Sequence, residues 1–317
     1  MPPGYERGLQ DVGNGVYAYL QPDGGWGWSN AGLVVDDDSS LLIDTLFDLR
    51  LTEQMLSEMR RAAPAAAHID TLVNTHANGD HTYGNQLVGD ARIVASRQTA
   101  EEMPELPAST MVTLLENAAS LGEVGAFFAR IFGTFDFGGI ETTLPTETFE
   151  GELVMHVGAR EVHLIEVGPA HTRGDTLVLL PADHVLFTGD ILFHGTHPLA
   201  WAGPISNWVA ACDLILAMDI EVVIPGHGPP ADKRAIQDLK DYLEYLGDQA
   251  RRLHAEGVAP LDAARQIALD RWAGWAEPER IVLNIATIYR EIENDSEPLN
   301  NLEIFQDMAA LAGERAR

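Results

Sequence analysis

Apolar residues in much of the chain come in short runs separated by turn-forming residues. Between residues 15 and 44, the runs GVYAYL, AGLVVD and SLLIDT are divided by Pro22-Asp23-Gly24-Gly25 and by Asp36-Asp37-Asp38. Runs of this length bounded by glycine, proline or aspartate are typical of buried strands. A second series, ELVMHV, EVHLIEV, DTLVLL, HVLFTG and EVVIPG, lies between residues 152 and 226. The repeated theme predicts a sandwich built from two similar halves.

Helical spacing replaces the strand pattern elsewhere. Leu51, Met55 and Met59 recur every four residues and predict a helix over about 49–61. From residue 230 onward the pattern predicts helices at 231–256, 260–272, 277–294 and 301–314. Pro260 and Pro298 mark boundaries between them. We therefore expect one domain over 1–317, in which 230–317 is a helical extension that packs on the sandwich or on a second subunit, as in a homodimer.

An insertion at about 104–145 separates the two halves. Its apolar residues recur at helical intervals, and it holds a group of phenylalanines at positions 127, 128, 132, 135 and 137. One interpretation is an amphipathic helix that covers the sandwich. The other is a lid whose apolar wall, including Phe128, contacts substrate.

Four of the apolar runs lead into side chains that bind metals. They are LVNT-HANGDH at 72–81, IEVGPAH at 165–171, VLFTGD at 185–190 and VVIPGH at 222–227. Loops at the carboxyl ends of strands form binding crevices in sheets covered by helices, so these residues can converge. A single histidine or aspartate there is more often a loop cap, but six at four equivalent places predict a metal centre: His76, Asp80, His81, His171, Asp190 and His227. Imidazole and carboxylate ligands suit zinc, and also iron or manganese.

These motifs, together with Asp44 in LLIDT, resemble in order and context the motifs of the metallo-β-lactamase superfamily over roughly 15–230. The resemblance implies a four-layered αβ/βα sandwich with metals at one edge of the two sheets. It implies a first metal site at His76 and His171, a second at Asp80, His81 and His227, and a bridging Asp190. Asp44 matches the family's aspartate that supports the metal loop without binding metal.

Asn78 departs from the family motif, because it stands where the second histidine of the first site is expected. An amide oxygen is a poorer zinc ligand than imidazole. We therefore predict one or two zinc ions, the second-site ion being the tighter. The alternative is that Asn78 coordinates weakly through its oxygen, or that water fills the gap. His197, a few residues after Asp190, is predicted to face the substrate pocket, where it is a substitute ligand, a proton shuttle or a loop cap.

Composition adds limits on partners. The formal charge of −28 repels nucleic acids and anionic membranes. The N-terminal MPPGYERGLQDVGNG has no secretion pattern, and no apolar run approaches the roughly 20 residues that span a bilayer. We expect a cytoplasmic protein that binds neither nucleic acid nor membrane. The single Cys212 lies in an apolar stretch and is interpreted as core packing.

The chemistry expected of such a centre is hydrolysis. A bound divalent ion lowers the pKa of its water toward about 7, and this water attacks an ester, thioester or lactone carbonyl, with Asp80 orienting it. Apolar walls are predicted from the glycine-rich loop with Trp26 and Trp28, and from Trp201. Either tryptophan of the loop is alternatively a core residue beside a turn.

Within the family, GGWGWSNAGLVVDDDSSLLIDTL and VGPAHTRGDTLVLLP look most like the cyclase-thioesterases of aromatic polyketide pathways. This resemblance implies a small-molecule or acyl-carrier-bound aromatic substrate. A different class stays open, since Asn78 is also compatible with a metal-binding relic or a redox relative with an impaired first site.

Overall fold

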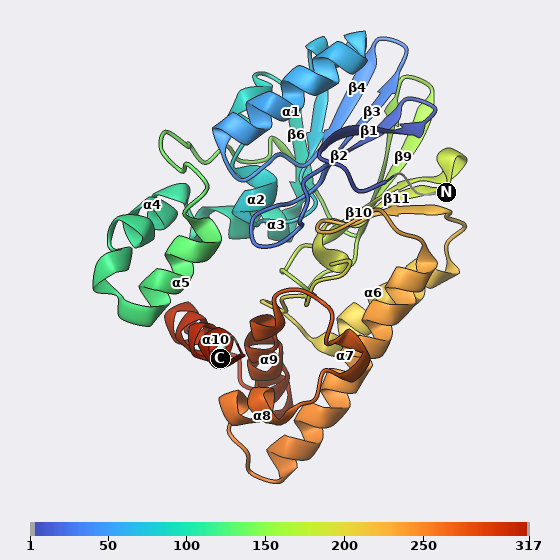
Figure 1. Ribbon diagram of the computed structural model, residues 1–317. Coiled ribbons are helices and arrows are strands. Elements are labelled where there is room, and N and C mark those ends of the chain that lie inside the picture. Colours follow the sequence, from blue (N-terminus) through green and yellow to red (C-terminus); the bar gives the residue numbers. More distant parts are fainter. Residues whose placement is uncertain (1–3, 316–317) are drawn as a thin grey trace.

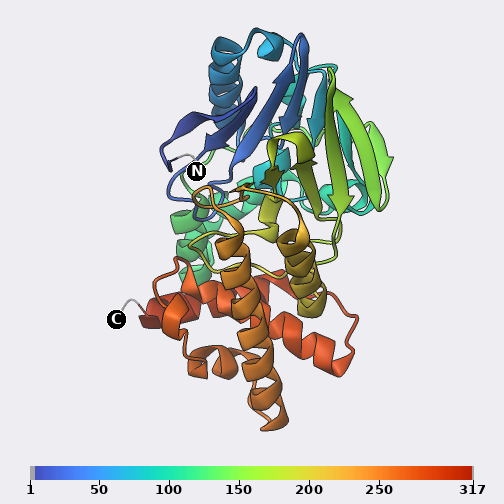
Figure 2. The ribbon, with the colours of Figure 1, turned by 90° about the vertical axis from the view of Figure 1, so that its right-hand side faces the viewer.

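Two β-sheets face each other in the computed structural model, which describes residues 4–315. The seven-stranded sheet has the order β1-β2-β3-β4-β5-β6-β7, and the five-stranded sheet has the order β12-β11-β10-β9-β8. Figures 1 and 2 show the two sheets side by side, with the helices after residue 230 gathered below them. The strands are β1 (Gly8–Gly13), β2 (Val16–Leu20), β3 (Ala31–Asp36), β4 (Ser39–Ile43), β5 (Thr71–Val73), β6 (Arg92–Ser96), β7 (Glu147–Phe149), β8 (Glu152–Val157), β9 (Arg160–Glu166), β10 (Thr176–Leu180), β11 (Val185–Phe187) and β12 (Val222–Ile224).

Alternation along the strands separates two layers of core. Val34, Leu41 and Ile43 belong to a buried cluster with Leu164 and Val178 of the opposite sheet, which is the core of the sandwich. Neighbouring residues on the same strands point the other way. Leu33, Leu42 and Leu72 share a second buried cluster with the apolar faces of the helices. The predicted four-layered sandwich is therefore confirmed.

Helices cover the sheets and extend beyond them. They are α1 (Leu49–Ala62), α2 (Gly79–Thr82), α3 (Arg97–Glu102), α4 (Ala108–Glu116), α5 (Gly122–Phe132), α6 (Ile205–Ala217), α7 (Lys233–Ala255), α8 (Pro260–Gln266), α9 (Ile281–Glu293) and α10 (Asn301–Arg315). The predicted helix over 49–61 is confirmed, and the Asp48 carboxylate caps it by accepting from the Leu51 N–H at 2.6 Å. The insertion at 104–145 contains α4 and α5.

Two of the predicted C-terminal helices are shorter than expected. The helix predicted over 260–272 ends at Gln266, because Ile267 adopts an extended conformation and is buried. The helix predicted over 277–294 begins at Ile281, because Glu277 is left-handed and a 3-10 turn at Pro278–Arg280 follows it. Within residues 4–315, no helix combines the length and the apolar character needed to cross a membrane. The first three residues of the N-terminal segment lie outside the described residues.

Candidate metal centre

The six predicted ligands converge at one edge of the sandwich, although they come from four segments of the chain. Parallel pairing of β4 with β5, and of β11 with β12, brings the carboxyl ends of neighbouring strands to the same edge. His76 follows β5, Asp190 follows β11 and His227 follows β12. Asp80 and His81 lie on the short helix α2, and His171 lies in the loop between β9 and β10.

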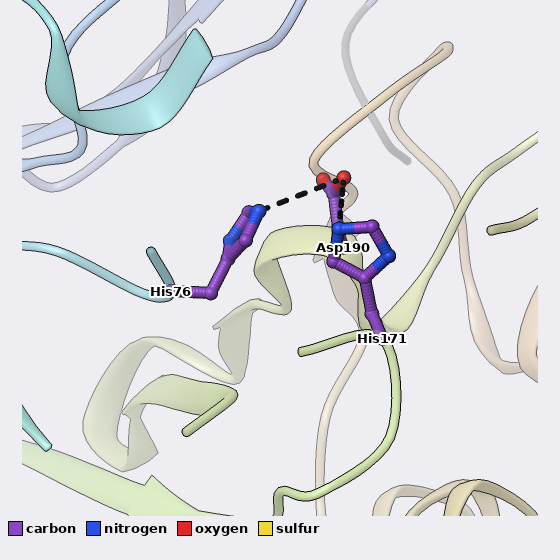
Figure 3. A group of neighbouring side chains, drawn as sticks. All are labelled: His76, His171 and Asp190. Atoms are coloured by element: carbon purple, nitrogen blue, oxygen red, sulfur yellow. Dashed lines mark ion pairs between the residues drawn. The ribbon is translucent and has the colours of Figure 1, made fainter. Parts of the chain in front are cut away.

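The donor atoms form two adjoining groups. In the first, Nε2 of His76 lies 3.7 Å and Nε2 of His171 lies 3.3 Å from Oδ2 of Asp190. Figure 3 shows both rings turned toward this carboxylate. In the second, Nε2 of His227 lies 3.2 Å and Nε2 of His81 lies 4.0 Å from Oδ2 of Asp80. Ligands about 2.0 Å from a tetrahedral zinc ion lie roughly 3.3 Å apart, so both groups have the dimensions of a metal site.

Asp190 faces both groups. Its Oδ1 lies 3.2 Å from Nε2 of His81, and its Oδ2 lies 3.4 Å from Nε2 of His227. Since Oδ2 also faces the two histidines of the first group, this one carboxylate can bridge two ions. The Asp190 side chain is 3% exposed, whereas that of Asp80 is 13% exposed. Asp80 therefore offers the cluster's more accessible carboxylate.

Each histidine of the cluster is oriented by a partner on its other ring nitrogen. Nδ1 of His81 donates to Oδ2 of Asp44 at 2.9 Å, and Nδ1 of His171 donates to the Leu199 carbonyl at 2.5 Å. Nδ1 of His227 faces the Gly24 carbonyl at 3.2 Å, and Nδ1 of His76 faces Oγ1 of Thr75 at 3.0 Å. Such partners fix the ring and leave the Nε2 lone pair for a metal.

Several of these inward atoms face one another without forming a hydrogen bond. Nε2 of His76, Nε2 of His81 and Oδ1 of Asp190 are buried without a hydrogen-bond partner. Buried polar atoms are nearly always satisfied, so unpaired atoms that converge on one place indicate a cation-binding site. The residues therefore fit a divalent metal, which would lie between imidazole nitrogens and carboxylate oxygens.

Charge inside the cluster is unevenly divided. Burial opposes protonation of His227, but the Asp190 and Asp80 carboxylates outweigh it and raise the pKa of His227 to about 9. Burial likewise opposes protonation of His81, yet Asp190, Asp44 and Asp80 raise its pKa well above the ordinary value. Burial and the neighbouring His81 lower the pKa of His76. Without metal, protons on His81 and His227 thus balance the carboxylates, and a cation would take their place.

Asn78 borders the first group. Its Nδ2 donates to Nε2 of His171 at 3.0 Å, and the side chain is half-buried. Because Nδ1 of His171 donates to Leu199, Nε2 is the acceptor in this contact. The amide thus occupies the lone pair that a first-site ion would use. Exchange of Nδ2 and Oδ1 by rotation about the Cβ–Cγ bond would instead present an oxygen.

Asp44 holds the loop that carries His76 and His81 through hydrogen bonds. Besides the bond to His81, its carboxylate accepts from the Thr75 N–H at 2.7 Å and from Thr75 Oγ1 at 2.7 Å. Thr75 was not predicted as a site residue, although it directly precedes His76 in the motif. Gly226 is also required, because a Cβ there would lie 1.9 Å from Oδ1 of Asp190.

The predicted substrate contacts lie in an aromatic cluster between the insertion and the C-terminal helix. Trp26 is 7% exposed and its ring contacts Phe132 and Phe305 at centroid distances of 5.8 and 5.9 Å. Phe128 is buried against Phe305 at 4.8 Å, and Trp201 contacts the same ring at 5.9 Å. Trp28 is half-buried and packs on Phe135 at 4.9 Å. Trp26 and Phe128 are thus packed residues, and a role in substrate binding stays a prediction.

His197 does not take the place of the missing histidine. It is fully buried, its Nδ1 is 2.8 Å from the Tyr242 hydroxyl, and its ring packs on Trp275. The interpretation as a substitute ligand is therefore wrong, because the backbone of 195–197 is held by Ala276 and directs the ring toward the C-terminal helices. Burial, followed by the nearby Arg280, lowers the pKa of His197 to about 3. Arg280 itself carried no signal in the sequence.

Comparison with known proteins agrees with this geometry. The human acyl-coenzyme A thioesterase MBLAC2 is 28% identical over 212 residues, which cover 63% of this chain and 72% of the relative. A linear primary-alkylsulfatase from Pseudomonas sp. (strain ATCC 19151) is 22% identical over 263 residues, or 72% of this chain and 48% of the relative. This chain therefore spans about half the length of that relative.

A solved structure shows the same fold over nearly the whole chain. The stereoselective inverting sec-alkylsulfatase Pisa1 from Pseudomonas sp. superposes with a TM-score of 0.71 at 19% identity, covering 94% of this chain and 53% of that one. The family model of the metallo-beta-lactamase superfamily matches residues 24–227, a range that contains all six side chains of the cluster. The chain belongs to the metallo-β-lactamase superfamily.

Proposed function

We propose that this protein is a zinc-dependent hydrolase that cleaves an ester, thioester or lactone of an apolar or aromatic substrate. The observation that carries the proposal is the convergence of four imidazole Nε2 atoms on two carboxylates, with several of these atoms unpaired. Superfamily relatives whose names describe a thioesterase and an alkylsulfatase support hydrolysis as the reaction class.

The six ligands of the cluster form two metal sites that share Asp190. His76, His171 and Asp190 would hold one ion, and Asp80, His81, Asp190 and His227 the other. When bound, the metal supplies a water that is ionised near neutral pH and polarises the carbonyl under attack. Asp80, the more accessible carboxylate, would orient the attacking water, whose proton passes to the leaving group. The water oxygen bonds to the carbonyl carbon, the C–O or C–S bond breaks, and the leaving alcohol or thiol takes up the proton.

A panel of aryl esters, aryl thioesters and lactones tests the proposal on the zinc-loaded protein. We expect turnover of at least one class, lost by about 1000-fold or more in Asp190→Ala, since both sites share this carboxylate. Asp90→Ala, whose side chain is 89% exposed, is the matched control and should retain activity. Absence of turnover across the panel by the unaltered protein would favour the metal-binding relic or the redox relative. The narrower cyclase-thioesterase assignment stays a prediction.

Unequal metal occupancy is the second part of the proposal. Asn78 supplies an amide that engages His171, so the first group keeps only two imidazoles and a shared carboxylate. We expect Asn78→His to raise zinc affinity of the first site by at least about 10-fold, because imidazole is the better ligand. Titration against a competing chromophoric chelator measures both affinities. Two equally tight equivalents in the unaltered protein, unchanged in Asn78→His, would contradict unequal occupancy.

A further inference from the structure

A buried arginine lies next to the metal cluster without a carboxylate partner. Arg280 is 1% exposed and stands at the end of the 3-10 turn that leads into α9. Asn284 of α9 holds the backbone of the 197–201 loop, accepting from the Ala200 N–H at 2.9 Å and donating to the Pro198 carbonyl at 3.0 Å. The arginine is therefore set rigidly against the loop that follows Asp190.

The guanidinium is incompletely satisfied. Nη1 donates to the His197 carbonyl at 3.1 Å, while Nε is buried without an acceptor. The adjacent Glu279 pairs with Arg130 at 3.6 Å instead, and no ion pair among residues 4–315 involves Arg280. A buried charge is costly unless it is paired. Glu277 and Glu279 act on the guanidinium only from beyond ion-pair distance, so its buried N–H group can still take an anion at hydrogen-bond distance.

Trp26 offers a second unused donor at the same place. The Arg280 Cζ lies 4.3 Å from the centre of the Trp26 ring, and Nε1 of Trp26 is buried without an acceptor. The loop that carries Trp26 is attached to the cluster at both ends. Its Gly24 carbonyl faces His227, and Oγ of Ser29 donates to the Asp80 carbonyl at 2.5 Å.

Ring contacts and charge place Arg280 close to the cluster. Its Cζ is 5.6 Å from the Phe193 ring, which stacks on His227 at a centroid distance of 5.1 Å. Burial lowers the pKa of Arg280, whereas Glu277, Glu279, Asp190 and Asp80 raise it. Metal ions would compensate the negative charge of Asp190 and Asp80. The positive charge of Arg280 would then attract an anionic group of a substrate bound beside the metal centre.

We propose that Arg280 and Trp26 form an oxyanion-binding position next to the metal centre, and that the substrate is an ester or thioester that also carries a carboxylate or sulfate group. The proposal rests on the hydrolase function and narrows its substrate class. Two buried N–H donors without acceptors, one of them on the guanidinium cation itself, favour an anionic group over a neutral one. The aromatic cluster around Trp26 contacts the apolar body that joins the anion to the scissile bond.

A matched pair of substrates tests the specificity. Mono-4-nitrophenyl glutarate carries a free carboxylate, and its methyl ester is the neutral twin. We expect the unaltered zinc-loaded protein to prefer the anionic ester, and Arg280→Met to lower the ratio of the two kcat/KM values about 10- to 100-fold. Arg280→Lys keeps the positive charge but loses the planar set of guanidinium donors, so it should lower the ratio less. Trp26→Phe keeps an aromatic ring but loses Nε1, and it should also lower the ratio less. An unchanged ratio in Arg280→Met would overturn the proposal.

Direct binding separates this proposal from the hydrolase function and from folding. Calorimetry of the zinc-loaded protein with glutarate and with inorganic sulfate shows which oxyanion is held, and binding of either that is lost in Arg280→Met supports the position. The control is Arg271→Met, because Arg271 also stacks on a tryptophan, Trp272, at 4.4 Å but pairs with Asp238 and Asp241. Binding of neither anion, or equal loss in both variants, overturns it. Failure of every ester to react, together with oxyanion binding that Arg280→Met abolishes, would defeat the hydrolase function and the substrate assignment but leave the oxyanion-binding position standing.

Discussion

The histidines of the cluster are ordered by their second ring nitrogen. Asp44 is the most connected of these supports, since one buried carboxylate holds His81 and both the N–H and the hydroxyl of Thr75. Removal of such a support typically costs metal affinity without removal of a ligand.

We expect Asp44→Asn to weaken zinc binding about 10- to 100-fold, because the amide cannot accept all three hydrogen bonds. Chelator competition measures the affinity. Asp48→Asn is the control: Asp48 is equally buried and caps α1 instead, so that variant should lose thermal stability and keep its affinity for zinc. Equal loss of affinity in both variants would show that Asp44 acts through general stability.

Residues at strand ends were predictable from sequence because apolar runs lead into each of them. The convergence of His76, Asp190 and His227 follows from parallel strands that end at one edge. His171 joins them because β9 and β11 are both antiparallel to β10, so β9 ends at the same edge. Arg280 was not predictable, because ERIVLNI reads as an ordinary helix start and its partners lie more than 80 residues away along the chain. The misplaced prediction for His197 has the same origin, since nearness to Asp190 in sequence says nothing of the ring's direction.

Helices and strands with regular spacing of apolar residues were predicted well, and those without such spacing were missed. The helix at 49–61 and the strands between residues 15 and 44 matched their periods. Strand β1 was missed because GLQDVG lacks alternating apolar residues and is fixed by pairing with β2. Turns within 267–280 broke the predicted C-terminal helices, since tertiary contacts of this segment with 195–197 override local preference.

Helix α10 closes the aromatic cluster through Phe305, whose ring contacts Trp26, Phe128 and Trp201. Because this ring joins the insertion to the metal-loop side, Phe305→Ala should lower the free energy of unfolding by about 2–4 kcal/mol. Chemical denaturation followed by tryptophan fluorescence measures the change. Leu302→Ala on the same helix is the control, since Leu302 is 45% exposed and should change little. A small effect of Phe305→Ala would show that α10 covers the cluster without stabilising it.

The whole molecule carries a formal charge of −28, which attracts cations to a cluster that needs them. The association rate of zinc with the metal-free protein should therefore fall as ionic strength rises, by several-fold between low salt and about 0.15 M, where the Debye length is near 8 Å. Stopped-flow mixing in a weakly coordinating salt such as perchlorate measures the rate. A rate that is constant or rises with salt would mean that the global field does not guide the ion.

Side chains from four distant segments are proposed to hold metal at one edge of the sandwich. Anomalous diffraction at the zinc absorption edge, from crystals of protein purified without chelator, tests it most directly. We expect a strong peak among Asp80, His81, Asp190 and His227, and a weaker one or none beside His76 and His171. Zinc bound elsewhere on the protein, or a cluster without any peak in zinc-saturated crystals, would contradict it.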